Sequence, residues 1–470
     1  MLKLFRKRNT RILLYGVGAF VYAIFHLMFL WVYEHGDSWY YMAFAEFLKT
    51  GKYPFQFPFI YQKPTTIAAP FYSLLILLYG LFPRGDIALH IVQLAILFGT
   101  SYFIYRILTH FTNKETAAFA AFIHLFVPAN IIFVSYAMTE IPTQFLLTVG
   151  IFILIRYFDT KNTTYLSFLT FVTVILMLLR YQFSIVFGVT VIINLYMMIK
   201  KRSTNIIPWM LTILSVTILF GWIWYNHSIT GVWGISDTVK IRFHAAFVAE
   251  GKFFPSEENP AVLELRKYVP ATVDKYTPWW GLQQYILPKI DNDWHRLDEI
   301  IGNVGVAAIR EHPIAYLFNT VNIFIRMHTT TTNRPWWFSL GWYSSPDPIA
   351  QQWVNCRTQH AFTYCRPIIM TPWSFALWDR FIKISTDSYE SMFRYFSIFI
   401  FFPSMVLLLF SGQLIKRILV LIYLIPQLYA SMGITPEPRY LVVYYPLILV
   451  ICVLGIGQAG KALRKNRHAE

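Results

Sequence analysis

Charged residues are scarce in this chain. Only 14% of its 470 residues are charged, whereas 56% are hydrophobic and 19% are aromatic. A soluble globular protein carries about 25% charged residues, so the composition excludes an ordinary soluble domain. Many apolar runs approach the ~20 residues that cross a bilayer as a helix. We therefore expect an all-α polytopic membrane protein.

Motifs for nucleotide and nucleic-acid binding are missing as well. The sequence has no zinc-finger spacing, no phosphate-binding loop and no glycine fingerprint for a dinucleotide. The net charge of +16 therefore does not indicate a nucleic-acid partner. The basic residues sit at the ends of apolar runs, where the positive-inside rule places many of them.

Cysteine is rare, with three in the whole chain. Cys356 and Cys365 both fall in a polar region, and Cys452 falls in the last apolar run. A Cys356–Cys365 disulfide fits an oxidising periplasm or lumen, and two unrelated free thiols are the alternative. A metal site there is disfavoured, because only His360 lies between the two cysteines.

About ten membrane spans can be assigned from the apolar runs. Their ranges are 12–33, 86–108, 116–136, 141–158, 163–180, 183–199, 206–225, 391–411, 417–433 and 439–458. The apolar segment 70–82 is too short to span, and we expect it to be interfacial or re-entrant.

These spans divide the chain into three modules. An N-terminal transmembrane module, 1–226, contains a first outer loop, 34–85, for which we expect amphipathic interfacial helices. A long outer loop region follows at 227–390, with an interfacial helix expected at 303–327, and 391–470 forms a C-terminal transmembrane module. Loops of such length usually carry function or form a small domain.

Charge gives the orientation of the chain. Every connection that this topology places inside is basic, as the positive-inside rule requires: Arg106, Lys114, Arg156, Lys161, Lys200, Lys201, Arg202, Lys416, Arg417, Lys461, Arg464, Lys465 and Arg467. This predicts cytoplasmic N- and C-termini. Compact length and sparse cysteine favour a bacterial inner membrane, with the endoplasmic reticulum as the alternative.

Polar motifs gather at the outer ends of the spans. His35-Gly36-Asp37-Ser38-Trp39-Tyr40-Tyr41 follows the first span, and Met138-Thr139-Glu140-Ile141-Pro142 begins another. The remaining motifs are Trp222-Ile223-Trp224-Tyr225-Asn226, Glu311-His312-Pro313 and Glu437-Pro438-Arg439-Tyr440. Each motif is short, so their order along the chain is more specific than any one of them.

This order resembles the C-type glycosyltransferase superfamily, in the branch of protein O-mannosyltransferases and the lipid A aminoarabinose transferase. The resemblance runs from the first span to the last. It implies a membrane transferase that uses a polyprenyl-phosphate sugar at an outward-facing site. In that family the acidic residue of the first outer loop is catalytic, and Asp37 occupies that place. The branch often has a second acidic residue beside it, where this chain has Ser38; we expect no required cofactor, with a divalent metal ion left open.

The chemistry of such a transfer fits these residue types. An acceptor hydroxyl that attacks an anomeric carbon must lose its proton, and a carboxylate within reach can take it. The leaving phosphate ester can be stabilised by cationic donors. A single displacement inverts the anomeric configuration and needs one base only, unlike the paired carboxylates of retaining hydrolases.

Each candidate residue has a role and a simpler alternative. Asp37 and Glu140 are the catalytic candidates, but Asp37 could be a helix-terminating or capping residue and Glu140 a charge at a helix start. Phosphate binding is assigned to Arg439, Tyr440 and Arg180, and substrate binding to His35, Tyr40, Asn226 and Glu437. Arg439 could instead be an interfacial anchor, Arg180 a turn charge and Asn226 a cap. The pairs Trp279-Trp280 and Trp336-Trp337 could stack on sugars or belong to an interfacial belt.

Two other functions compete with an inverting glycosyltransferase. A transporter or lipid flippase would also be polytopic, but transporters favour internal repeats and ionisable groups at mid-membrane. The second competitor is a ligase that joins whole lipid-linked polymers, and the sequence distinguishes it poorly from the glycosyltransferase. The expected partners are a polyprenyl-phosphate sugar, the bilayer and an acceptor that is a lipid, a glycan or a protein.

Overall fold

The computed structural model describes residues 36–52, 65–134, 136–201, 204–329, 357–359, 362–364, 392–433 and 439–467, with scattered positions between 17 and 24. The first predicted span, 12–33, falls almost entirely outside these residues. The described elements are helices except for one hairpin, in which β1 (Arg357–Gln359) pairs antiparallel with β2 (Phe362–Tyr364).

Seven of the described helical segments are long and apolar enough to cross a membrane. They are α4 (Gly85–Phe111), α7 (Glu140–Thr160), η2 (Tyr181–Phe183) continuing into α9 (Ser184–Lys200), α10 (Ile206–Thr230), η6 (Ser397–Phe401) continuing into α19 (Phe402–Leu409), α20 (Leu414–Ser431) and α22 (Tyr445–Arg467). A further apolar helix, α8 (Thr163–Leu179), is shorter. The architecture is that of a multi-pass helical membrane protein, and a count near ten is not confirmed within the described residues.

The predicted span 116–136 is not one helix. α5 (Lys114–Leu125) ends before Pro128, and α6 (Pro128–Phe133) begins there. Proline has no backbone N–H to donate to the preceding turn, and its ring clashes with a helix that continues through it. The break at Pro128 therefore follows from the sequence, although hydropathy alone does not reveal it.

Buried polar side chains join three helices of the bundle. Asn194 on α9 donates from Nδ2 to Ser167 Oγ on α8 at 3.0 Å and to Thr212 Oγ1 on α10 at 2.8 Å. All three side chains are buried. Between apolar helices such hydrogen bonds, together with small residues, fix how the helices pack.

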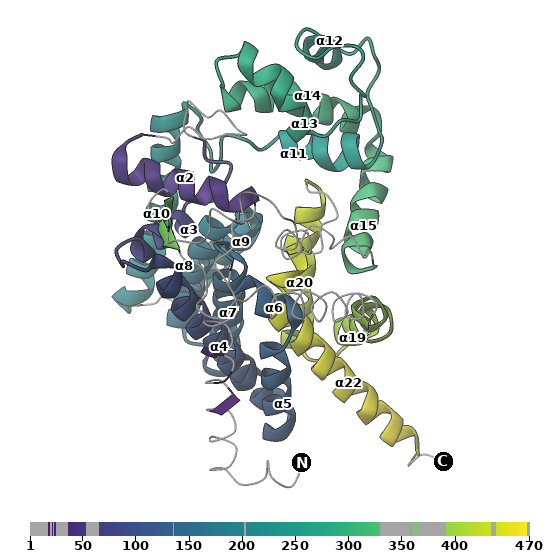
Figure 1. The fold of residues 1–470 in the computed structure, drawn as a ribbon. Helices are drawn as coiled ribbons and strands as arrows, with labels where there is room; N and C mark the ends of the chain where they lie inside the picture. Colours follow the sequence, from purple (N-terminus) through teal and green to yellow (C-terminus); the bar gives the residue numbers. More distant parts are fainter. Residues whose placement is uncertain are drawn as a thin grey trace, which may run out of the picture.

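A second group of helices covers one end of the bundle (Figure 1). The first outer loop contributes α2 (Gly36–Thr50) and α3 (Phe71–Tyr79), and α3 is too short to span, as expected for 70–82. The later outer region contributes α11 (Ile241–Phe243), the π-helix η3 (His244–Glu250), α12 (Pro260–Arg266), α13 (Trp279–Ile286), η4 (Leu287–Lys289) and α14 (Trp294–Glu311). The helices of the later outer region share an apolar core that includes Phe247, Leu265, Ile286 and Ile301.

The helix predicted at 303–327 is two helices that meet at His312. α14 ends at Glu311, and α15 (Pro313–Thr329) begins at a proline, which cannot continue the preceding helix. Tyr316 near the start of α15 packs edge-on against Phe247 of the outer group, whereas Ile323 and Met327 join the core of the bundle. α15 therefore connects the outer helices with the bundle instead of lying along the interface (Figure 1).

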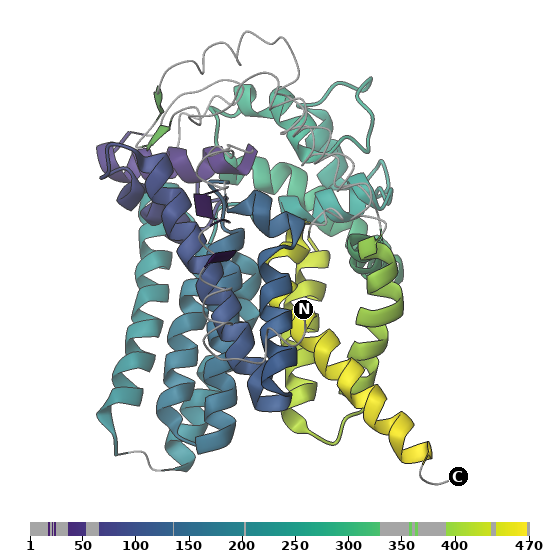
Figure 2. The ribbon, with the colours of Figure 1, turned by 60° about the horizontal axis from the view of Figure 1, so that its bottom comes forward.

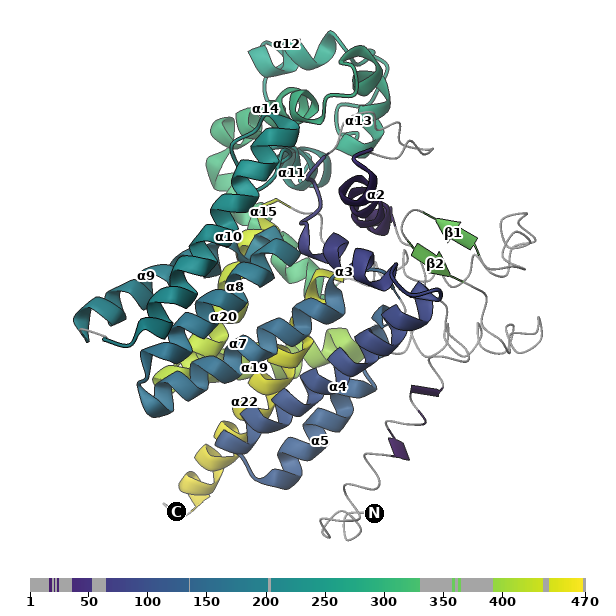
Figure 3. The same cartoon turned by 90° about the vertical axis from the view of Figure 1, so that its left-hand side faces the viewer.

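The basic connections lie at the opposite end of the bundle. α22 ends there at Arg467, and the connections α4–α5 and α7–α8, which carry Lys114 and Lys161, lie at the same end (Figures 2 and 3). The positive-inside rule assigns this end to the cytosol. By the same rule, the end covered by α2, α3 and α11–α14 is predicted to be the outer face.

Candidate functional site

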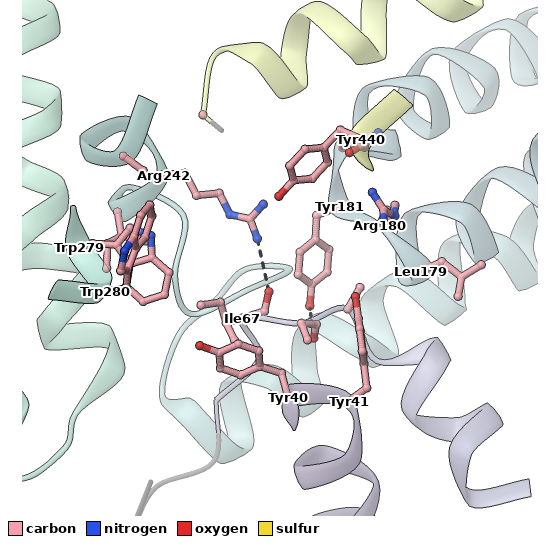
Figure 4. Close-up of a pocket in the computed structure, with 16 residues that line it drawn as sticks. Tyr40, Tyr41, Ile67, Leu179, Arg180, Tyr181, Arg242, Trp279, Trp280 and Tyr440 are labelled. Carbon is pink, nitrogen blue, oxygen red and sulfur yellow. Dashed lines mark hydrogen bonds between the residues drawn. The ribbon is translucent and has the colours of Figure 1, made fainter. Parts of the chain in front are cut away.

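A cavity of about 260 Å³ opens where the outer helices meet the bundle. Its wall combines α2, residues 67–69, the junction of α8 with η2, the 241–245 segment, α13, the turn after α20 and α21 (Arg439–Val442) (Figure 4). Three predicted site residues line it, namely Tyr40, Arg180 and Tyr440. The cavity thus brings together motifs that lie up to 400 residues apart in the sequence.

Arg180 stands on one side of this cavity, where α8 ends in an extended residue. Its Nε donates to Thr139 Oγ1 at 2.9 Å, and its Nη2 forms an ion pair with Glu140. Its guanidinium carbon lies 5.6 Å from the centroid of the Tyr440 ring, within the range of a cation–π contact. Arg180 is therefore a cation that Thr139 and Glu140 fix in the cavity wall, rather than a solvated charge in a turn.

Glu140 begins α7 and is fully buried. One carboxylate oxygen accepts from Arg180, and the other has no hydrogen-bond partner among the described residues. Glu140 does not line the cavity, and a buried carboxylate at this depth depends on its cation. This geometry favours a role in holding Arg180 over the direct catalytic role expected from the sequence.

The same helix also holds the far side of the site. Gln144, one turn beyond Glu140, donates from Nε2 to the carbonyl of Val442 at 2.8 Å. Val442 ends the short helix α21, on which Tyr440 lies. The first two turns of α7 therefore fix Arg180 and Tyr440 relative to one another.

Arg242 is a cavity residue that the sequence did not reveal. It lies on α11 and points across the cavity toward Tyr440 (Figure 4). Its Nη2 donates to the carbonyl of Ile67 at 3.4 Å. Among the described residues, no carboxylate lies within ion-pair distance of it. A lone arginine in a long loop carries no motif, so only the fold marks it.

Aromatic side chains form the wall opposite Arg180. Trp279 and Trp280 open α13 and stand edge to face, with ring centroids 5.8 Å apart. Both line the cavity beside Tyr40 of α2 (Figure 4). The proposed sugar-stacking pair therefore reaches the site, whereas Trp336 and Trp337 fall outside the described residues.

A second cavity of about 200 Å³ adjoins the first. The two share Tyr181, Gln182, Arg242 and Gly433. Beyond these residues the wall of the second cavity is largely apolar, from Ile235, Val239, Phe243, Tyr316 and Met432 among others. Arg242 stands where the first cavity, whose lining is mixed polar and apolar, meets the largely apolar second cavity.

Asn226 has a structural role beside the site. Its Oδ1 accepts from Thr66 Oγ1 at 2.7 Å, and its Nδ2 donates to the carbonyls of Val232 and Gly234 at 3.1 and 2.9 Å. These bonds satisfy the amide inside the protein, which argues against the predicted contact with substrate. α10 then ends at Thr230, and the residue that caps it is Gly231, whose φ of +76 suits glycine.

A buried carboxylate completes this network. Asp237 is 3% exposed, and its Oδ1 accepts from Thr65 Oγ1 at 3.1 Å and from the backbone N–H of Thr66 at 3.2 Å. Burial disfavours its charged form and raises the pKa of Asp237 to about 6. Asp237 and Asn226 together hold residues 65–66, and the following residues, 67–69, line the cavity.

Several predicted residues lie wholly or partly outside what the structure describes. Asp37 is the second residue of α2, one turn before Tyr40 and Tyr41, and Arg439 begins α21, but their side chains are outside what is described. His35, Glu437, Cys356 and Cys365 lie outside the described residues altogether. Where side chains are described, no group of three His, Cys, Asp or Glu residues gathers.

The apolar helices and the outer cavity define the class, a multi-pass helical membrane protein. No protein-family model and no curated protein matches the chain. Among solved structures it is similar to ArnT from Cupriavidus metallidurans in the apo state, with a TM-score of 0.36 and 12% identity, over 96% of this chain and 77% of that one. A likeness at this level transfers neither site residues nor an activity, so the case for a function rests on the cavity.

Proposed function

We propose that the protein is an inverting glycosyltransferase that moves a sugar from a polyprenyl-phosphate donor to an acceptor hydroxyl on the outer face of the membrane. The observation that carries this proposal is the half-buried guanidinium of Arg242, which faces a cavity and has no carboxylate partner among the described residues. Arg180 lines the same cavity. Arginine binds phosphate oxygens through a planar fork of donors, and a site with such cations suits an anionic ligand.

The two cavities together suit a ligand with three chemically different parts. A phosphate at Arg242 would sit at their junction, with a sugar toward Trp279 and Trp280 and the first isoprene units in the apolar cavity. A free sugar phosphate would use only the first cavity, which Trp279 and Trp280 line. The apolar compartment therefore favours a lipid-linked donor over a soluble one.

The place of the cavity supports the direction of the reaction. Its lining elements α2, α11 and α13 lie at the end of the bundle away from the basic connections (Figures 1 and 2), and the positive-inside rule assigns that end to the outer face. A lipid-linked sugar in the outer leaflet could enter sideways, with its tail remaining among the helices. An acceptor would then approach from the outer solution or from the same leaflet.

We assign Asp37 as the base, one helical turn before the cavity residues Tyr40 and Tyr41. As the acceptor oxygen bonds to the anomeric carbon, Asp37 takes the hydroxyl proton. The bond between that carbon and the phosphate oxygen breaks, and its electron pair stays on the polyprenyl phosphate. Arg242 and Arg180 stabilise this leaving group. The products are an inverted glycoside and a lipid phosphate.

Donor binding by an arginine variant tests the phosphate site. Arg242→Ala should weaken a polyprenyl-phosphate sugar about 10–100-fold, because a hydrogen bond to a charged group contributes about 1.5–3 kcal/mol. Arg310→Ala removes an exposed arginine of α14 and is the matched control. Competition binding with purified protein in detergent gives both affinities. Equal donor affinity in the wild type and Arg242→Ala would remove Arg242 from the site.

A further inference from the structure

Residues 240–244, which include Arg242, pack directly against one face of α14 that carries two glycines. Asp298, Gly302 and Gly305 are spaced by four and three residues, so they share one face of the helix. All three are buried. Each of them contacts the backbone of residues 240–244, and none of them lines the cavity.

Asp298 caps the start of α11. Its Oδ1 accepts from the backbone N–H of Ile241 at 2.7 Å, and its Oδ2 accepts from the backbone N–H of Lys240 at 3.1 Å. A carboxylate that binds the free N–H groups at a helix start both satisfies them and orients the first turn. Arg242 is the next residue along that turn.

The two glycines allow the segment to approach the axis of α14. A Cβ at Gly302 would lie 2.7 Å from the carbonyl carbon of Lys240 and 2.9 Å from the nitrogen of Ile241. A Cβ at Gly305 would lie 2.5 Å from the nitrogen of His244. Lys240 Cβ, which would also overlap a Cβ at Gly302, is bonded directly to the backbone, and the other blocking atoms are backbone atoms. Any larger residue must therefore displace residues 240–244 themselves.

We infer that the Asp298/Gly302/Gly305 face of α14 is a positioning element that sets the place of Arg242 at the junction of the two cavities. The three residues act through the backbone and do not touch the ligand. The identity of the ligand rests on the proposed function, which has Arg242 bind the phosphate of a polyprenyl phosphate. The position of Arg242 itself can be measured without any ligand.

Gly302→Ala and Asn303→Ala form a matched pair on neighbouring positions of α14, since Asn303 is exposed. A misplacement of about 1 Å in a reacting geometry can lower a reaction rate about 100-fold, and we expect a loss of up to the same size in the affinity of a misplaced binding group. We therefore expect Gly302→Ala to weaken binding of tritiated undecaprenyl phosphate to the full-length protein about 10–100-fold, and Asn303→Ala to leave it unchanged. The apparent unfolding temperature of each variant shows whether the fold is retained.

A double variant separates positioning from general damage. If Gly302 acts through Arg242, adding Gly302→Ala to Arg242→Ala should weaken the binding of undecaprenyl phosphate by less than a further threefold. The reason is that the side chain being positioned is already gone. The same factor in both backgrounds would overturn the inference. Should Gly302→Ala fail to fold, Asp298→Asn is nearly isosteric and removes one of the two carboxylate acceptors, and the same non-additivity is expected.

The ligand-free measurement uses the thiol introduced by Arg242→Cys. Its reaction rate with a water-soluble maleimide, followed by mass spectrometry, should change at least threefold when Gly302→Ala is added and stay constant with Asn303→Ala. An unchanged rate would overturn the inference even if donor binding is as proposed. Failure of the wild type to bind undecaprenyl phosphate, with a changed thiol rate, would refute the proposed ligand and leave the positioning element standing.

Discussion

Replacing Glu140 by glutamine separates a positioning role from a catalytic one. The substitution keeps the shape of the side chain and one oxygen that can accept from Arg180, but it removes the negative charge. The Glu140 and Arg180 side chains are 0% and 10% exposed, so water cannot replace the lost charge. Arg180 would be left as a nearly buried cation with a weaker partner.

The size of the effect follows from this burial. Breaking a buried ion pair by removing one partner costs about 3–5 kcal/mol. Because glutamine retains one hydrogen bond, we expect the lower end, about 3 kcal/mol, divided between fold stability and the position of Arg180. Donor affinity should fall at least about tenfold, while turnover at saturating donor should stay within a few-fold of the wild type.

The assay compares donor affinity, turnover and apparent unfolding temperature for Glu140→Gln, Arg180→Gln and the double variant. The double variant should be no less stable than Glu140→Gln, since it removes the uncompensated cation. A Glu140→Gln protein with normal donor affinity and turnover reduced about 1,000-fold would refute this reasoning. Glu140 would then be a reacting group, as the sequence suggested.

Two further outcomes concern the cavity wall and the network behind it. Trp280→Ala should weaken the sugar-bearing donor about 2–10-fold more than bare polyprenyl phosphate; equal losses for the two lipids would exclude contact with the sugar. For Asp237, the folded-state pKa of about 6 exceeds the usual 3.8, so the fold binds this proton more tightly than the unfolded chain does. Stability should therefore fall by up to about 3 kcal/mol as pH rises from 4 to 6. Asp237→Asn should flatten this decline in the apparent unfolding temperature, and an identical decline in both proteins would contradict the assignment.

Local patterns in the sequence mark some of the residues that line the outer cavity. Arg180 and Tyr440 each stand at the outer end of an apolar run, and a cationic or phenolic side chain at a helix end projects near the membrane surface. The fold brings both to one cavity, 5.6 Å apart as measured from guanidinium carbon to ring centroid. Trp279 and Trp280 line the same cavity, and their stacking on a sugar stays a prediction.

Residues that depend on long-range packing could not be predicted in the same way. Arg242 lies in a segment whose backbone contacts Asp298 and two glycines, about 60 residues later in the chain. The amide of Asn226 is used by Thr66, 160 residues earlier in the chain. Hydropathy located the long apolar segments, but it joined stretches that Pro128 and Pro313 divide.

In the proposed reaction, a lipid-linked sugar meets its acceptor beside Asp37 at the outer cavity. The most direct measurement is the release of undecaprenyl phosphate when purified protein is given a panel of undecaprenyl-phosphate sugars and acceptors. The wild type should release the lipid phosphate from at least one sugar, and Asp37→Asn should do so about 100–10,000-fold more slowly with unchanged donor affinity. Release by Asp37→Asn at the wild-type rate would contradict the claim.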